Sequence, residues 1–481
     1  ICKAVDGLPL AIELAAAWTP YYSLDEIAQQ VRQDPSALAT VGRGQARHHH
    51  TLHAAIEFSY RLLSSDEQSL HRRLSVLPGA FSRELAESLS EDADQRRRTA
   101  GLLARLAHRS LLTVAPSPGG TRFAQLATVR SHASHALAYL GEVDAVTDRR
   151  DAWTLRLIRD RPFTGRPEEA AWYERVTINL AVVRATLQRS LVAAPAPLGS
   201  EVATELLGYW YYSGLTYEGL QWLTLAVSGV VESGHRALLK ELVFGSLLAL
   251  EGRADDARAA LARAAELPAT AGHEEQLAEA LVSLASTFST ISDAVSIRRA
   301  LALARPLIEI AGNPALAVAA EAVDCLAEAI KEPTPAVAER AREVFERAST
   351  IGNLWASWLT CSTVCWVALT TGDAQLGLVW SRRLLSLQNG VGAHAILPQF
   401  ETFADFLALS GNVEHAARTF SATYDAARRS GAPWPRNHIT RELLTRAQQQ
   451  LSKARFDEAW ALGRTLGRAQ LLELAPLTQP T

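Results

Sequence analysis

The sequence predicts a mostly α-helical protein in which a helical segment and a winged-helix domain precede an α-solenoid of tetratricopeptide-like helical hairpins. Alanine and leucine dominate the 481 residues, which are 48% hydrophobic and 21% charged, and this composition favours helices. The one β-hairpin pattern follows several helices, which is the element order of a winged helix. Beyond it, a turn recurs about every 40 residues, a spacing typical of stacked helical hairpins.

Charge and cysteine content bound the function of the chain. The net charge of −3 gives no general affinity for nucleic acids or anionic membranes. Four cysteines form no disulfide framework in a chain of this length, so we expect a cytoplasmic protein. No apolar run approaches the roughly 18 residues of a membrane span, and the start lacks a signal-peptide pattern, so we expect neither a signal peptide nor a membrane partner. The chain lacks methionine and begins with Ile1, which indicates a piece of a longer protein.

Residues 1–50 are predicted to be helical. In the stretch GLPLAIELAAAW, which starts at Gly7, apolar residues recur at the spacing of one helical face. Pro9 fits there because the first turn of a helix does not use its N–H. A second helix is predicted over 24–31, where Ser23 and Glu26 have the spacing of a capping box.

Residues 51–142 carry the winged-helix pattern. Four helices are expected first: one over 51–63, one from the capping box of Ser64 and Glu67 to about Leu77, a short one after the N-cap Ser82, and one over 100–109. A hairpin follows, in which SLLTVA (110–115) and TRFAQL (121–126) flank the turn PSPGG. A helix over 128–139 closes the domain. The stretch DQRRRT (94–99) is predicted to be a solvated, mixed-charge loop. A helical bundle with an exposed loop is the alternative to the winged helix.

Residues 143–200 are predicted to be a helical connector, 201–470 the repeats and 471–481 a tail. Four turns combine a glycine with a small residue five positions later, and their glycines are Gly214, Gly252, Gly372 and Gly411. Two further turns are implied near positions 292 and 332, where the glycine is missing. Glycine supplies the left-handed residue that ends the first helix, and the small residue lets the second helix approach closely.

No catalytic motif is complete. The chain lacks G-x-x-x-x-G-K-[ST], H-E-x-x-H, paired C-x-x-C and G-x-S-x-G motifs, so we expect no catalytic residues and no enzyme activity from this segment. The stretch RHHHTLH could bring His49, His50 and His53 together on a helix, but further ligands are missing. We therefore interpret it as a polar linker and expect no metal site.

Two other groups of residues allow a structural or a functional interpretation. Trp355, Trp358, Trp366 and Trp380 fall within two neighbouring hairpins and form either core or a concave groove for a ligand or peptide. Cys361 and Cys365 share a helix face, and buried thiols are preferred over a metal pair because no further ligand is near.

Several stretches resemble one family of regulators. The stretch GLPLAIELAAAW resembles the Gly-Leu-Pro-Leu motif of STAND signal-transduction ATPases, which include the NB-ARC group. The stretch from Arg47 to Ser82, together with LLARLAHRSLLTVA and TRFAQLATVRSHASHAL, resembles the winged-helix region of actinobacterial SARP- or LuxR-type regulators. The segments NLAVVRATLQRSL and LSKARFDEAWALGRTL resemble the entry to the repeats and the last repeat of that family.

The resemblance implies a nucleotide site at the start of the chain. In the family the motif proline packs on the adenine, so the implied cofactor-binding residues are Gly7, Leu8 and Pro9, and residues 1–50 would be the last part of a nucleotide-binding domain. The region that faces the phosphates of ADP maps to about Leu126–Arg130. Ala127 replaces the usual glutamate there, so no contact is carried over. The preceding P-loop domain and the output domains of the family are absent from the chain.

The resemblance also implies a function. We expect the sensor and hinge portion of an ATP/ADP-dependent switch, a slow regulatory ATPase at full length, with a transcriptional output. Its repeats would bind a protein or small-molecule inducer, and self-association could accompany activation. No nucleotide is expected to bind tightly to this segment alone. The winged helix is expected to act as a hinge without direct DNA contact, because its helix over 100–109 is rich in leucine and alanine. The alternatives are a helical-repeat scaffold without nucleotide dependence and a winged-helix DNA-binding regulator.

Overall fold

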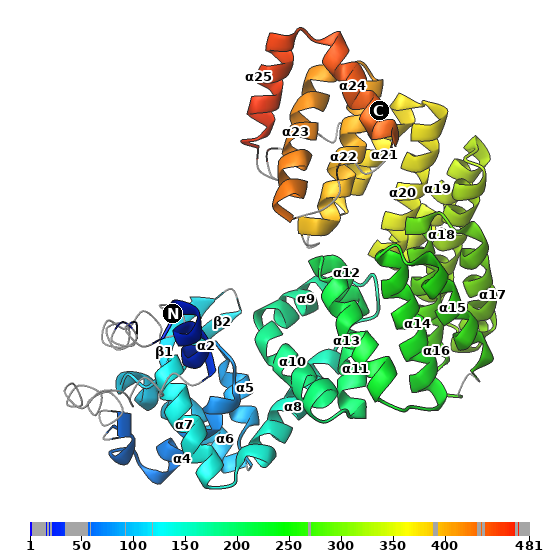
Figure 1. The fold of residues 1–481 in the computed structure, drawn as a ribbon. Coiled ribbons are helices and arrows are strands. Elements are labelled where there is room, and N and C mark those ends of the chain that lie inside the picture. The colour runs from blue at the N-terminus through cyan, green and yellow to red at the C-terminus, as the bar shows by residue number, and fades with distance from the viewer. Residues whose placement is uncertain are drawn as a thin grey trace. The chain divides into compact units, whose positions relative to one another are not determined.

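The computed structural model is mostly α-helical and contains one β-hairpin in the part of the chain that it describes (Figure 1). The described residues are 1, 16, 19, 22–33, 56–57, 59–91, 93–117, 119–267, 271–387, 393–430, 434, 438–466 and 470. The chain divides into an N-terminal unit of residues 1–159 and 175–189 and a repeat unit of residues 160–174 and 190–481. None of the described helices combines the length and the apolar character that a membrane span requires.

The N-terminal unit follows the predicted order of helices, hairpin and closing helix. Its elements are α2 (Leu24–Gln33), α4 (Ser65–Arg73), the 3-10 helix η3 (Leu74–Val76), α5 (Arg83–Ser88), α6 (Ala93–His108), β1 (Thr113–Ser117), β2 (Gly120–Ala124), α7 (Ala127–Tyr139), α8 (Val143–Arg159) and α10 (Leu180–Leu187). Their core is mostly aliphatic, with Leu74, Leu85 and Leu103 fully buried.

Side-chain caps fix where the first helices of this unit begin. The predicted capping box of Ser64 and Glu67 is confirmed, because each side chain bonds to the backbone N–H of the other residue. Ser82 accepts the N–H of Leu85 at 3.1 Å and starts α5 as predicted. Such caps satisfy N–H groups that have no partner within the helix.

The predicted hairpin is confirmed, but its turn is shorter than expected. The strands pair as far as Ser117 and Gly120, so the five-residue turn predicted over 116–120 is wrong. Gly120 has a φ of 106°, which allows the tighter reversal. Phe81 extends the sheet through backbone bonds to Phe123, with N···O distances of 2.8 and 2.9 Å in the two directions.

The stretch DQRRRT is helical, so the loop predicted over 94–99 is wrong. It forms the first turns of α6, which therefore starts well before the predicted residue 100. Arginine and glutamine are good helix formers, and Asp94 pairs with Arg97 one turn later. Mixed charge alone did not distinguish an exposed helix from a loop.

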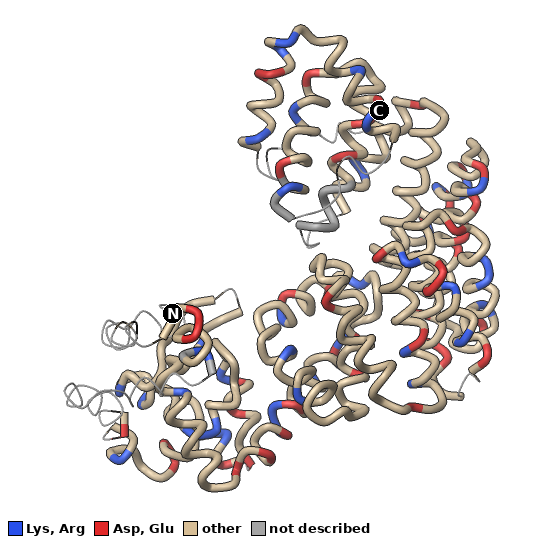
Figure 2. Tube along the Cα trace, in the orientation of Figure 1, with Lys and Arg blue, Asp and Glu red and all other residues tan. Residues whose placement is uncertain are grey.

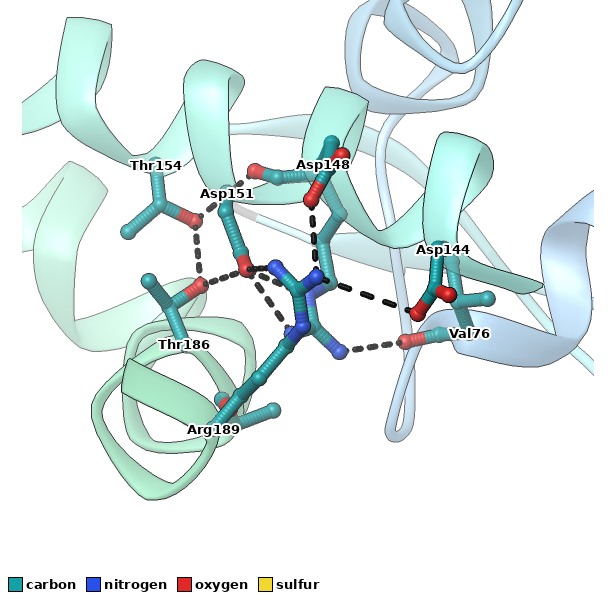
Figure 3. A network of polar contacts seen from close by, with 9 residues as sticks. Val76, Asp144, Asp148, Asp151, Thr154, Thr186 and Arg189 are labelled. Carbon is teal, nitrogen blue, oxygen red and sulfur yellow. Dashed lines mark hydrogen bonds and ion pairs between the residues drawn. The ribbon is translucent and has the colours of Figure 1, made fainter. Parts of the chain in front are cut away.

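A buried ionic network joins α8 to α10 and to the π-helical turn η4 (Gln188–Ala193) (Figure 3). Asp151, which is 1% exposed, accepts hydrogen bonds from Arg150 at 2.7 and 2.9 Å and from Thr186 at 2.7 Å. Its second carboxylate oxygen accepts one from Arg189 at 2.8 Å. The buried charges of Arg150 and Asp151 on α8 are thus compensated inside the unit, which is how buried charges are tolerated.

The repeat unit is a series of helical hairpins. Before the hairpins come α9 (Glu169–Ile178), which begins in this unit, and α11 (Pro197–Glu205). The successive pairs are α12 (Leu207–Ser213) with α13 (Thr216–Gly229), α14 (Gly234–Leu250) with α15 (Ala254–Glu266), α16 (Glu274–Thr287) and η5 (Phe288–Ile291) with α17 (Ala294–Ala311), α18 (Pro314–Lys331) with α19 (Pro335–Ile351), α20 (Leu354–Thr371) with α21 (Ala374–Ser386), α22 (Ala393–Leu409) with α23 (Val413–Ser430), and α24 (His438–Gln450) with α25 (Lys453–Gly463).

The predicted turns lie where each first helix ends. The four predicted glycines adopt left-handed φ values: Gly214, Gly252, Gly372 and Gly411. At the implied turn near 292, Ser292 takes the same conformation with a φ of 54°, so the repeat continues there without glycine. Gly312 and Gly352, which the repeat pattern did not predict, end α17 and α19 in the same way and connect one hairpin to the next.

Small residues after the turns let helices pack closely, as the repeat pattern predicts. A methyl group on Gly219 would meet the ring of Trp210 on the first helix of the same hairpin. A methyl group on Gly377 would overlap the ring of Phe406 on α22, which belongs to the following hairpin. The small residue therefore serves packing within a hairpin at one repeat and between hairpins at another.

Replacing Gly377 with alanine is expected to destabilise the repeat unit by about 1–3 kcal/mol, because the new methyl group forces Phe406 out of its site. Thermal unfolding followed by circular dichroism measures the effect. Gly229→Ala is the matched control, because its methyl group would meet Pro195 at an ordinary 3.6 Å. Equal melting temperatures of Gly377→Ala and the control would contradict this account of the packing.

Candidate ligand-binding site

The sequence-predicted nucleotide residues Gly7, Leu8 and Pro9 lie outside the described residues, as do His49, His50 and His53. Of the region that resembles the phosphate-facing segment, Leu126 precedes α7 and Ala127 starts it. Among the described side chains, no group of three or more histidine, cysteine or acidic residues could hold a metal ion. The candidate site that the structure does describe lies elsewhere, in the repeat unit.

A cavity of about 230 Å³ opens on the face made by the first helices of five successive hairpins, α12, α14, α16, α18 and α20. Each of these helices contributes at least one lining side chain: Tyr211 of α12, Val243 of α14, Glu279 of α16, Leu326 of α18 and Trp358 of α20. Because a repeat places equivalent helices side by side, residues far apart in the sequence line one surface. Concave, mostly apolar cavities with a few polar groups are the usual form of small-molecule sites.

The segment before α9 supplies the cation of this cavity. Arg161 donates two hydrogen bonds to the carboxylate of Glu279, at 2.9 and 2.8 Å. The backbone N–H of Thr164 donates to the same carboxylate at 3.0 Å. The Nε atom of Arg161 lies 3.6 Å from Glu205, close enough for an ion pair but too far for a hydrogen bond.

The two carboxylates of the cavity differ in their electrostatic state. Burial opposes ionisation of Glu279, but Arg161 and Thr164 outweigh it and keep the pKa of Glu279 below its ordinary value. Burial raises the pKa of Glu205, and Arg161 offsets that rise only in part. Glu279 is therefore a satisfied structural anion, whereas Glu205 is an acid whose charge the protein leaves incompletely balanced.

The segment that carries Arg161 is fixed to the repeats at Gly165. Gly165 has a φ of 88° and accepts a backbone hydrogen bond from Leu354 at the start of α20, at 2.8 Å. Its N–H donates to Glu169 at 2.9 Å, and Tyr173 also donates to Glu169, at 2.5 Å. A side chain at position 165 would collide with Asn353, so both the conformation and the close approach require glycine.

Part of this site follows from the sequence. Trp355 and Trp358 line the cavity, whereas Trp380 is 4% exposed and packs against Phe345, so the tryptophans divide between the predicted groove and the predicted core. Arg161, Glu205 and Glu279 were missed. Glu205 and Glu279 are charges within helices and Arg161 lies in the segment between α8 and α9, and none of these positions reveals a partner distant in the chain.

The cysteines of the repeats are core residues. Cys325, Cys361 and Cys365 are buried, and burial raises the pKa of the Cys325 thiol to about 11. Thiols with raised pKa values hold their protons and are poor nucleophiles and metal ligands.

Basic residues on α6 of the N-terminal unit are largely engaged by acidic side chains. Arg98 pairs with Asp66 at 3.2 Å, and Arg105 pairs with Glu67 at 2.6 Å. Figure 2 shows basic and acidic residues interspersed along both units. DNA-reading helices need unneutralised cations for phosphates and base edges, so these ion pairs weaken the case for DNA recognition by α6.

A buried histidine in this unit is kept neutral. His71 is fully buried beside Tyr60 and His132, and burial lowers its pKa to about 3. Its Nδ1 atom lies 3.3 Å from Gln125, and its Nε2 atom has no partner within the described chain. Protonation would place an uncompensated charge in the core.

The N-terminal unit is therefore expected to lose about 2 kcal/mol of stability between pH 7 and pH 5 through His71. The unfolded chain binds this proton near the ordinary pKa of 6.5, and the folded chain only near 3, so unfolding takes up a proton in that interval. Urea-dependent hydrogen exchange of α4 and α7 peptides measures the loss. His71→Leu should flatten the dependence, and an unchanged slope in this variant would refute the assignment.

Comparisons with known proteins give distant relatives. No protein-family model matches the chain. It is 30% identical over 261 residues to a "putative HTH-type transcriptional regulator" of Mycobacterium tuberculosis, covering 52% of this chain and 29% of the relative. It is 35% identical over 151 residues to an uncharacterized protein of the same organism, covering 31% of this chain and 38% of that one. The chain thus spans well under half the length of these curated relatives.

Among solved structures, the chain is similar to a STAND protein with a tetratricopeptide repeat sensor from Pyrococcus horikoshii. The TM-score is 0.42 and the sequence identity 12%, and the similarity covers 94% of this chain and 74% of the other.

Proposed function

We propose that the chain is the sensor and hinge portion of a STAND-type regulatory switch that uses ATP and ADP and has a transcriptional output. The observation that carries this proposal is the cavity on the repeat face, because a preformed pocket with a buried ionic cluster suits an inducer. The name of the mycobacterial relative agrees with a regulatory output. The Gly-Leu-Pro-Leu resemblance around Pro9 supports nucleotide dependence.

The position of Arg161 in the chain suggests how the signal travels. Arg161 follows the end of α8 by two residues, and its side chain is bound by Glu279 in the cavity. An inducer that changes the contact between Arg161 and Glu279 therefore acts on the segment that follows α8 directly. In this mechanism the inducer stabilises one state of the connection over another, and nucleotide exchange follows.

The full-length gene product tests the proposal. We expect it to contain a P-loop upstream of Ile1, to copurify with ADP, and to lose that ADP in a Pro9→Ala variant. The 481-residue chain alone should show no ATP turnover above background. Robust turnover by this chain, or a full-length protein without a P-loop, would contradict the proposal and favour a repeat scaffold without nucleotide dependence.

A gel-shift assay of the same 481-residue chain examines the DNA-binding alternative. We expect no shift with the promoter of its own gene at physiological salt, because Arg98 and Arg105 are engaged within the protein. A sequence-specific shift would replace the hinge assignment by direct operator recognition.

A further inference from the structure

The wall of the repeat cavity presents hydrogen-bond acceptors. Several lining hydroxyls donate their single proton to a carbonyl of their own helix: Thr204 to Ser200 at 2.7 Å, Ser286 to Ser283 at 2.8 Å and Thr287 to Leu284 at 2.8 Å. A hydroxyl that already donates its only proton to a carbonyl can offer a ligand only its lone pairs, as a hydrogen-bond acceptor.

The guanidinium of Arg161 and the amide of Gln276, which line the cavity, are already engaged. Both terminal nitrogens of Arg161 bond to Glu279, and Gln276 donates to Glu205 at 2.6 Å. A ligand that brings acceptors must therefore compete with these carboxylates for Arg161 and Gln276, whereas a ligand that brings N–H donors meets lone pairs on several sides.

The charges of the cavity favour a cation. Of the residues that line it, two are acids and one is basic, which leaves a formal charge of −1 when all are ionised. Glu279 is neutralised by Arg161, so the excess charge belongs to Glu205. Burial raises the pKa of Glu205, which means that its ionised form lacks a full partner and that a bound cation would supply one.

Aromatic rings complete the cavity. Tyr211 and Tyr212 come from α12, and Trp355 and Trp358 come from α20. Tyrosine and tryptophan faces attract cations through their negative quadrupoles and also pack against apolar groups. Apolar side chains such as Leu239 and Val243 line the same space, so the ligand needs an apolar body beside its charge.

We propose that this cavity binds a small organic ammonium ion, with Glu205 as its counter-ion, the lining hydroxyls as acceptors and the aromatic rings around its apolar part. Its role as the inducer rests on the function proposed above, whereas binding itself needs neither nucleotide nor DNA. The two can therefore fail separately.

Isothermal titration of the 481-residue chain tests the proposal with four probes: phenethylamine, hexylamine, the neutral 2-phenylethanol and the anionic 3-phenylpropanoate. We expect saturable binding of the amines, with the alcohol bound at least tenfold more weakly and the carboxylate not at all. Glu205→Gln should weaken phenethylamine binding about ten- to a hundredfold, the range of a charge-assisted hydrogen bond. It should leave 2-phenylethanol unaffected.

Two further variants keep the test decisive. Glu201→Gln is the matched control, because Glu201 lies one turn earlier on α11 and pairs with Arg236 outside the cavity lining. We expect it to bind phenethylamine within twofold of the parent chain. Trp358→Leu should lower the affinity for phenethylamine about fivefold. This variant tests amine binding in the cavity if Glu205→Gln fails to fold. Failure of both amines to bind, preference for the alcohol or the carboxylate, or equal losses in Glu205→Gln and Glu201→Gln would overturn the proposal.

Discussion

Replacing Asp151 with alanine is expected to lower the free energy of unfolding of the N-terminal unit by about 3–5 kcal/mol. The carboxylate balances Arg150, which is 7% exposed, and holds Thr186 and Arg189 as well. Without it, the guanidinium of Arg150 stays in the interior without its anion. Removing one partner of a buried pair costs more than the pair contributes, because desolvation of the remaining charge is no longer offset.

Urea-dependent hydrogen exchange of peptides from α8 and α10 measures this loss within the N-terminal unit. Asp148→Ala is the matched control, since Asp148 lies one turn earlier on α8, pairs with the same Arg189 and is 64% exposed. Exposed ion pairs contribute about 0–1 kcal/mol, so the control should unfold close to the parent chain. Similar protection in the two variants would show that the network in Figure 3 does not hold these helices together.

Arg161→Leu is expected to destabilise the repeat unit by about 3–5 kcal/mol at neutral pH. The substitution leaves the carboxylate of Glu279 buried with only the contacts from Thr164. Arg161→Lys should destabilise the repeat unit less, because lysine keeps the positive charge although it loses the bidentate contact with Glu279. Arg342→Ala is the control, since its partner Glu339 is 60% exposed and the loss of this pair should cost at most about 1 kcal/mol.

The destabilisation by Arg161→Leu should shrink as pH falls. In the parent chain the pKa of Glu279 is below the ordinary 4.5, so its ionisation stabilises the fold above that pH and the gain is lost as pH falls further. In the variant, burial without the arginine raises the pKa of Glu279, so the fold loses stability as pH rises through that value. The parent and the variant should therefore differ most near pH 7 and least below about pH 4.5. Urea unfolding followed by tryptophan fluorescence tests this, and a pH-independent difference would count against it.

The sequence by itself determined the local structure of this protein. The caps at Ser64 and Ser82, the hairpin before α7 and the glycine turns at Gly214 and Gly372 all follow from contacts within a few residues. Such contacts are encoded in residue type and spacing, so the sequence reveals them directly. The repeat period then predicts a stack of hairpins, since a single hairpin cannot bury its apolar face. The errors were also local, at the hairpin turn and the start of α6.

Only the tertiary structure decided which distant residues meet. Arg161 reaches Glu279 and approaches Glu205 from a segment that looks like an ordinary connector, and Trp358 joins the same cavity from α20. Helical periodicity gives the face on which a residue lies but not the segment that inserts against it. That choice depends on packing, on the close approach allowed by Gly165 and on the need to pair buried charges, which are properties of the folded chain as a whole.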